Sequence, residues 1–239
     1  MKFGLRQFQF TTGGRRLQGA AVCGKIEPEK QKGGCVMSKY DTSIDNILDI
    51  EINNIIAVKK SLDRDTMEKV IDLMLQVKPS GHKVITAGCG TSGTLAERVA
   101  HSLCVVEVPA TFCAPGNSVH GGLGLIQKGD VVVLFSKGGN TPEIVNYIPC
   151  CKAKGATIIG VSQNDDSILA TQSDIYFKIL CEHECDIWDM CASASCNTIA
   201  AVWDAVAFTV MRHNGYTKDD LRLTHPGGKV GQLLMAEQK

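Results

Sequence analysis

The stretch that decides the fold is Val131-Val132-Val133-Leu134-Phe135, followed directly by Ser136-Lys137-Gly138-Gly139-Asn140-Thr141 and Pro142. Five consecutive apolar residues predict a strand that buries side chains on both faces, as in the middle of a parallel sheet. Pro142 predicts a helix start, because proline is favoured at the first position of a helix. The stretch is therefore typical of the strand–loop–helix unit of an α/β protein.

Four further apolar runs predict strands elsewhere in the chain, at residues 83–87, 110–113, 157–161 and 175–179. Helical stretches over residues 94–103 and 142–154, and a turn near Ile168, separate the five predicted strands. Such alternation is typical of parallel sheets with helices on both faces. We therefore expect an α/β fold, a doubly wound three-layer αβα sandwich with a five-stranded parallel sheet.

Outside the sheet, the apolar pattern predicts three more helices. Apolar residues recur at helical spacing from Ser43 to Val77, and Asp63-Arg64-Asp65 divides this run into two helices. A long helix from about Ser195 to His213 ends at Gly215, a residue typical of helix C-caps. No linker-like stretch separates these elements, so we expect a single domain.

The composition excludes several classes of protein. The 25 basic and 25 acidic residues cancel, so no net charge favours nucleic acid or an anionic membrane as a partner. No run of 18 apolar residues is present to span a bilayer, and the N-terminus lacks the apolar core of a secretory signal. We therefore expect a cytoplasmic protein with no nucleic-acid or membrane partner, and its 44% apolar residues are ample for a core.

Residues 1–36 differ from the rest of the chain, since they show neither helical nor strand periodicity. One interpretation is a disordered basic extension. Another comes from the genetic code, because Lys32-Gly33-Gly34 can be encoded as AAA-GGA-GGN, which contains a purine-rich ribosome-binding sequence at a normal spacing before the Met37 codon. Under that interpretation the extension is mis-annotated and translation begins at Met37. Both interpretations place the folded domain at residues 37–239.

Eleven cysteines allow three interpretations. A disulfide framework does not fit a long, core-rich chain without an export signal. A metal site is conceivable around Cys181-Glu182-His183-Glu184-Cys185, but neither this segment nor its neighbours has the Cys-x2-Cys spacing of a zinc knuckle; those neighbours are Asp186, Asp189, Cys191 and Cys196. We expect most cysteines to be small buried side chains, and we expect no metal or other cofactor.

Two loops that follow predicted strands combine glycines with hydroxyl side chains, Gly88-Cys89-Gly90-Thr91-Ser92-Gly93 and Ser136–Thr141. Glycines let the backbone approach an anion, and the N-terminus of the following helix offers free N–H groups. The first loop also fits the Gly-x-Gly-x-x-Gly fingerprint of dinucleotide sites. However, the next strand ends at Cys113-Ala114-Pro115-Gly116, without the acidic residue that such a site needs. Two such loops on one sheet edge favour a phosphomonoester.

These motifs resemble those of a known family. Ser136-x-Gly138-Gly139-x-Thr141-x-Glu143 resembles the Ser-x-Ser-Gly-x-Ser/Thr signature of sugar-isomerase (SIS) domains. Three further segments are similar to the arabinose-5-phosphate isomerase branch: Gly88-x-Gly90-x-Ser92-Gly93, His120-Gly121-Gly122-Leu123-Gly124 and His225-Pro226-Gly227-Gly228-Lys229-Val230-Gly231. The resemblance covers residues 41–234. Because the chain ends at Lys239, it is similar to members of the branch without CBS domains.

The resemblance implies a phosphosugar aldose–ketose isomerase of the D-arabinose 5-phosphate/D-ribulose 5-phosphate type, acting through a cis-enediol and without a metal. It implies that Glu184 and His225 are catalytic, and His225 also suits this role because it precedes a proline on a loop and histidine is a common proton carrier. It further implies homotetramers with sites at subunit contacts. The residues that it implies for sugar-phosphate binding are Gly90, Thr91, Ser92, His120, Ser136, Lys137, Gly139, Asn140 and Thr141.

The chain also departs from that branch. The branch usually has Lys, Glu, Ser and Asp where this chain has Thr91, Asn140, Gly138 and Gly122. The first two changes remove a cation and a carboxylate; Lys137 is another source of positive charge, although an extended backbone would direct it away from Ser136. A non-catalytic phosphosugar-binding or sensing protein is therefore the alternative function. A zinc-dependent isomerase of the heptose-phosphate type fits less well, since its His and Glu ligands are not evident.

Overall fold

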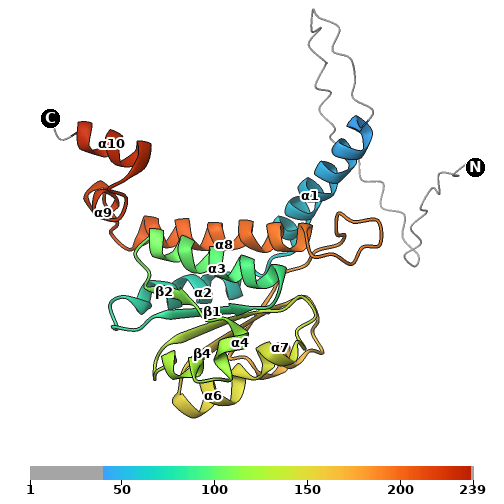
Figure 1. Cartoon of the computed structure of the whole chain (residues 1–239), viewed down its shortest axis with the longest axis horizontal. Coiled ribbons are helices and arrows are strands. Elements are labelled where there is room, and N and C mark those ends of the chain that lie inside the picture. Colours follow the sequence, from blue (N-terminus) through green and yellow to red (C-terminus); the bar gives the residue numbers. More distant parts are fainter. Residues whose placement is uncertain (1–39, 238–239) are drawn as a thin grey trace, which may run out of the picture. The chain divides into compact units, whose positions relative to one another are not determined.

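A five-stranded parallel sheet lies at the centre of residues 40–237, the part of the chain that this computed structural model describes (Figure 1). The strand order is β2-β1-β3-β4-β5, and every pair is parallel. Each predicted strand matches an observed one to within one residue at either end; the observed strands are β1 (Val84–Gly88), β2 (Ala110–Phe112), β3 (Val131–Phe135), β4 (Thr157–Ser162) and β5 (Ile175–Lys178). The prediction for residues 1–36 and the Met37 start lie outside the described residues.

Strand β3 explains why the sheet is covered on both sides. Successive side chains of a strand point to opposite faces, and all five residues of β3 are buried. Val131, Val133 and Phe135 belong to one apolar cluster, and Val132 and Leu134 belong to another. The doubly wound sandwich predicted from the sequence is therefore confirmed.

Helices supply the two outer layers. The first cluster includes residues of α2 (Arg64–Val77), α3 (Thr91–Val105) and α8 (Ala194–His213), with Val58 near the end of α1 (Asp41–Ser61). The second cluster includes residues of α5 (Pro142–Val145), α6 (Tyr147–Lys154) and α7 (Ile168–Gln172). The short helices α4 (Pro115–Ser118) and η1 (Gly122–Leu125) follow β2. Asp63 caps α2 by accepting the N–H of Asp65, as the sequence predicts.

The long helix α8 packs against α1, α2 and α3. By length and composition alone α8 is apolar enough to cross a membrane. Its apolar side chains have another explanation, because Ile199, Val202, Trp203, Val206 and Val210 are buried in the first cluster. The Trp203 ring meets the ring edges of Phe135 and Phe177 at centroid distances of 5.7 and 6.1 Å. These buried residues form one face of α8, which packs on the sheet.

Two parts of the secondary structure differ from the prediction. The single helix expected over residues 142–154 is divided at Asn146 into α5 and α6, because Pro149 has no N–H to donate to the carbonyl of Val145. Two further helices, α9 (Lys218–Thr224) and α10 (Gly228–Ala236), lie in a region to which the apolar pattern assigns no element. Thr217 and Asp220 form a capping box at α9, a signal that periodicity alone does not report.

The strand order places the two glycine loops side by side. Strand β1 lies between β2 and β3, so the direction of strand order reverses next to it. Gly88 at the end of β1 is in register with Phe135 at the end of β3. The loops that follow these residues therefore begin at neighbouring positions on the carboxyl edge of the sheet, where open α/β sheets bind ligands.

Candidate active site

The loop after β3 forms a compact polar turn. Ser136 Oγ lies 2.8 Å from Thr141 Oγ1 and accepts the N–H of Gly139 at 3.0 Å. The turn brings together two hydroxyl groups that are five residues apart in the sequence. Thr141 is the N-cap of α5, which begins with Pro142 as predicted. The structure thus unites Ser136, Gly139 and Thr141, three of the residues predicted to bind a phosphate.

Gly139 fits this turn only because it lacks a side chain. Its φ is +71°, and a Cβ atom would lie 2.2 Å from Ser167 Oγ and 2.4 Å from Ser167 Cβ. Its carbonyl accepts the N–H of Leu169 at 3.1 Å, so the turn packs directly against α7. The neighbouring Gly138 has no heavy atom within 4 Å of a Cβ position. The serine that the isomerase branch usually has at position 138 would therefore fit here.

We expect Gly139→Ala to lower the free energy of unfolding by about 1–3 kcal/mol, because it combines a left-handed backbone with overpacking. Gly138→Ala is the matched control and should change stability by less than about 1 kcal/mol. Urea unfolding monitored by circular dichroism measures both. Equal losses for the two variants would contradict this description of the turn.

The loop after β1 is also built by close backbone approach. A Cβ atom on Gly88 would lie 2.3 Å from the carbonyl oxygen of Ser92, and one on Gly93 would lie 2.8 Å from that of Gly88. Gly90 has a φ of +56° and is the N-cap of α3, so Thr91 and Ser92 occupy the first turn of that helix. The first N–H groups of a helix have no partner within it and suit an anion.

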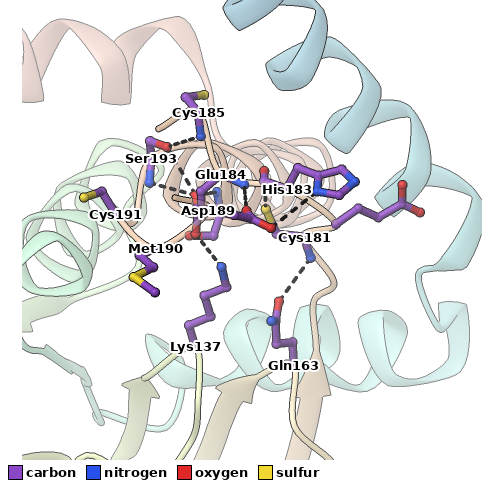
Figure 2. A network of polar contacts seen from close by, with 12 residues as sticks. Lys137, Gln163, Cys181, His183, Glu184, Cys185, Asp189, Met190, Cys191 and Ser193 are labelled. Atoms are coloured by element: carbon purple, nitrogen blue, oxygen red, sulfur yellow. Dashed lines mark hydrogen bonds and ion pairs between the residues drawn. The ribbon is translucent and has the colours of Figure 1, made fainter. Parts of the chain in front are cut away.

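Both oxygens of the Glu184 carboxylate are hydrogen-bonded. Figure 2 shows Lys137 reaching toward Glu184 from the loop after β3. The Glu184 side chain is 0% exposed, and its Oε1 atom lies 2.6 Å from Lys137 Nζ. Its Oε2 atom accepts the N–H groups of Ser193 at 2.9 Å and Ser195 at 3.1 Å, at the start of α8. Lys137 and Glu184, two predicted site residues 47 positions apart, are thus in direct contact.

The surroundings of Glu184 fix its charge. Burial alone would raise the pKa of Glu184, but the Lys137 ammonium group and hydrogen bonds at the start of α8 outweigh burial and lower this pKa to about 2. Burial also raises the pKa of the nearby Cys196 thiol, the Glu184 carboxylate raises it further, and hydrogen bonds from Ser195 and Ser92 oppose the rise.

Helix α1 is hydrogen-bonded to the segment that carries Glu184, and the sequence does not predict this contact. The buried Asn54 side chain donates to the carbonyl of His183 at 2.8 Å and accepts the N–H of Glu182 at 2.7 Å. Asp189 accepts the N–H of Glu184 at 2.5 Å (Figure 2). Asn54 lies in a helix more than 120 residues away from its partners, so no local motif could identify it. Ser193 directly precedes a helix, and this N-cap pattern was the available signal for it.

Asn140 has a structural partner. Its Oδ1 atom accepts the N–H of Ile168, the first residue of α7, at 2.8 Å. The amide of Asn140 thereby ties the loop after β3 to α7. Thr91, another position where the branch usually has a charged residue, is exposed in a groove of about 400 Å³ between α3 and α8, next to Cys196 and Asn197.

The two predicted site histidines are not hydrogen-bonded to this cluster among the described residues. His120 is exposed between α4 and η1. A Cβ atom on Gly122 would lie 2.7 Å from the carbonyl oxygen of Asn117, so the aspartate that the branch usually has there does not fit without a backbone shift. Within residues 40–237, no hydrogen bond or ion pair links His120 or His225 to Glu184 or to the two loops.

His225 lies on the segment between α9 and α10, on a loop as predicted, and its Nδ1 atom is 3.1 Å from Thr224 Oγ1. Glu184 is bound at the start of α8, whereas α9 and α10 follow its end (Figure 1). The 20 residues of α8 make it about 30 Å long. One chain therefore does not bring its two predicted catalytic residues together.

The cysteine-rich segment does not form a metal centre among the described residues, since no three His, Cys, Asp or Glu side chains there gather as a metal ion would need. All nine described cysteines are free. Cys113, Cys151, Cys181 and Cys196 are buried, as expected for small apolar side chains, but Cys104 and Cys191 are exposed and do not fit that expectation.

Comparisons with known proteins agree with this geometry. A family model described as the SIS domain matches residues 79–212. Arabinose 5-phosphate isomerase KdsD of Francisella tularensis is 28% identical over 186 residues, which are 78% of this chain and 57% of the relative. The enzyme of the same name from Pseudomonas aeruginosa is 30% identical over 171 residues, 72% of this chain and 52% of the relative. The chain thus spans about half the length of the curated relatives it matches.

Two solved structures are similar over their whole length. A Listeria monocytogenes protein named as a candidate sugar-phosphate isomerase is 38% identical, with a TM-score of 0.77 over 80% of this chain and 100% of its own. An Escherichia coli protein solved in complex with arabinose 5-phosphate is 28% identical, with a TM-score of 0.72 over 80% of this chain and 100% of its own. With its sheet, its two loops and this family match, the chain belongs to the SIS domain family of phosphosugar isomerases.

Proposed function

We propose that this protein is an aldose–ketose isomerase that acts on a sugar phosphate, of the D-arabinose 5-phosphate/D-ribulose 5-phosphate type. The observation that carries the proposal is the buried Glu184 carboxylate in contact with Lys137, a residue of the hydroxyl-lined turn after β3. A phosphate site and a carboxylate base close together are what this reaction requires. The relatives named as arabinose 5-phosphate isomerases support the choice of substrate.

The reaction moves one carbon-bound proton from C2 to C1 and one oxygen-bound proton from the C2 oxygen to the C1 oxygen, and it needs no oxidant. A base removes the proton from C2 of the aldose while the oxygen at C1 gains a proton, which gives a cis-enediol. Return of a proton to C1 and loss of the proton from the C2 hydroxyl then give the ketose. In this proposal Glu184 Oε1 carries the carbon-bound proton, and the Ser136–Thr141 turn and the start of α3 hold the phosphate. His225 assists opening of the sugar ring.

The position of His225 leads to a proposal about assembly. Because Glu184 and His225 lie at opposite ends of α8 in one chain, we propose a homotetramer in which His225 serves the site of a neighbouring copy. The family resemblance to proteins with sites at subunit contacts supports this arrangement. The function therefore depends on contacts between copies of the chain.

Coexpression of Glu184→Gln chains with His225→Ala chains tests this assembly. Each variant alone is expected to be inactive, whereas hybrid oligomers should regain isomerase activity, since some sites combine an intact Glu184 with an intact His225. The measurement is activity of hybrids verified by native mass spectrometry. Verified hybrids without activity would contradict a site shared between copies.

A non-catalytic phosphosugar-binding or sensing protein is the second candidate. Thr91 and Asn140 favour it, because neither supplies the charge that the isomerase branch usually has at its position, and Asn140 is hydrogen-bonded to α7.

The test of the proposed function is an isomerase assay with D-arabinose 5-phosphate, D-ribulose 5-phosphate and a panel of pentose and hexose phosphates. Turnover of at least one is expected. Equal binding of ribulose and ribulose 5-phosphate would exclude a phosphate-directed site.

A further inference from the structure

The two oxygens of the Glu184 carboxylate have different partners. Oε2 is fixed by backbone N–H groups at the start of α8, which form part of the rigid helix–sheet packing. Oε1 has one hydrogen-bond partner among the described residues, the ammonium group of Lys137 at 2.6 Å. Because the side chain is fully buried, Oε1 can accept a proton from a substrate carbon only after Lys137 Nζ has moved.

The backbone of Lys137 is held by hydrogen bonds, whereas its side chain is partly exposed and able to move. Its carbonyl accepts hydrogen bonds from Ser162 Oγ and from the N–H of Gln163, both at 3.1 Å. Its side chain remains 33% exposed, so the ammonium group can reach solvent or a ligand. The residue directly precedes the glycines of the phosphate-binding turn, and Ser136 is its neighbour on the other side. A phosphate in that turn therefore lies within the reach of a lysine side chain.

A bound phosphate would compete with Glu184 for the same cation. A phosphomonoester dianion carries about two negative charges near neutral pH and accepts several hydrogen bonds, whereas Glu184 carries one negative charge and keeps its bonds to Ser193 and Ser195 without Lys137. Among the described residues, Lys137 is the one cation bonded to the Glu184 carboxylate. The other groups near Glu184 are Asp189, which accepts the N–H of Glu184, and the thiols of Cys181 and Cys196. His183 bonds to Asp189 and Glu51 to Cys185 and Asn197.

We propose that Lys137 acts as a phosphate-dependent switch of the base: it occupies Glu184 Oε1 in the free protein, and a phosphate bound in the Ser136–Thr141 turn draws it away and frees that oxygen. This inference rests on the proposed function, which places the phosphate in that turn. It assigns the phosphate a role in turnover besides binding. An unphosphorylated sugar leaves Lys137 on Glu184 and finds the base blocked.

The direct test follows the Glu184 carboxylate itself and needs no catalysis. In protein with ¹³C-labelled glutamate side chains, the Glu184 signal is assigned by its loss in Glu184→Gln and titrated from about pH 3 to pH 7. The probe is inorganic sulfate, a tetrahedral ion that stays divalent in this range, against sodium chloride of equal ionic strength. In sodium chloride Glu184 should stay ionised over this range, because its pKa is about 2. Sulfate should raise the titration midpoint by about one to three pH units, the usual effect of losing a neighbouring opposite charge, and so bring protonation of Glu184 into the range.

The outcomes separate this inference from the proposed function. Sulfate binding, measured by calorimetry, with an unchanged Glu184 midpoint would overturn the switch and leave the phosphate site intact. Failure of the protein to bind sulfate, inorganic phosphate or any sugar phosphate would overturn both. Because this titration uses the unmodified chain, it decides the question even where a Lys137 variant does not fold.

Kinetics of a Lys137→Met variant supply the second test. Solvent deuterium should enter an unphosphorylated pentose faster in this variant than in the wild type, because the base is no longer blocked, and added inorganic phosphite should accelerate only the wild type. Lys83→Met is the matched control: Lys83 Nζ lies 2.6 Å from the buried Asp130, with side-chain exposures of 30% and 2%, close to the 33% and 0% of the Lys137–Glu184 pair. Equal phosphite acceleration in Lys137→Met and wild type would overturn the inference.

Discussion

Replacing Glu184 with glutamine is expected to slow exchange of the substrate C1 or C2 proton with solvent by about 10²–10⁴-fold, the usual effect of losing a positioned proton-transfer group. Glutamine keeps the shape of the side chain, and its carbonyl oxygen can still accept the N–H groups of Ser193 and Ser195. The phosphate-binding turn after β3 is unchanged. The loss should therefore fall on kcat, and the dissociation constant for the sugar phosphate should not rise.

The nearby Glu182 offers a matched control, because it is exposed. Among the described residues, its one hydrogen bond runs from its backbone N–H to Asn54. The Glu182→Gln variant should catalyse exchange of the substrate C1 or C2 proton at the wild-type rate. Nuclear magnetic resonance of substrates incubated in heavy water measures both variants. Equal rates for Glu184→Gln and Glu182→Gln would remove Glu184 from the proposed mechanism.

The second large effect is on stability in acid. The pKa of Glu184 is lowered from 4.5 to about 2 in the folded protein, so this carboxylate favours folding when it is ionised. Its contribution is complete above about pH 5 and is lost as the pH falls toward 2, and a shift of this size corresponds to about 3 kcal/mol. Glu184→Gln should therefore be less stable than wild type near neutrality, and the difference should shrink steadily below about pH 5.

Urea unfolding at a series of pH values measures this difference, and the same series with Glu182→Gln corrects for the general effect of removing one negative charge. Subtracting the two variants also removes the acid sensitivity that other carboxylates share, such as Asp130 with Lys83. A stability difference that does not change between pH 7 and pH 3 would show that Glu184 does not hold its low pKa in solution.

The sheet could be predicted from the sequence because its signals are local. Val131–Phe135 is apolar at every position, and Pro142 marks the helix that follows, so the unit can be recognised without knowledge of its neighbours. The division of the helix at Asn146 was also readable, since Pro149 cannot donate a backbone hydrogen bond.

The candidate site was predictable only in part, because its contacts join distant segments. The residues of the turn after β3 share one motif and meet as expected, with Ser136 and Thr141 in contact. Lys137 was expected to point away from Ser136, but its actual partner, Glu184, lies 47 residues later and could not be predicted. Asn54 on α1 supports that segment from 129 residues away, a pairing that no spacing rule contains.

The central claim is that this chain moves a carbon-bound proton of a sugar phosphate, and solvent exchange in the wild type tests it most directly. The unmodified protein is incubated in heavy water with D-arabinose 5-phosphate, D-ribulose 5-phosphate and other pentose and hexose phosphates, and binding of each is measured in parallel. We expect deuterium at C1 or C2 of at least one sugar phosphate that binds. Tight binding of sugar phosphates with no deuterium in any of them would contradict the isomerase and establish a binding protein.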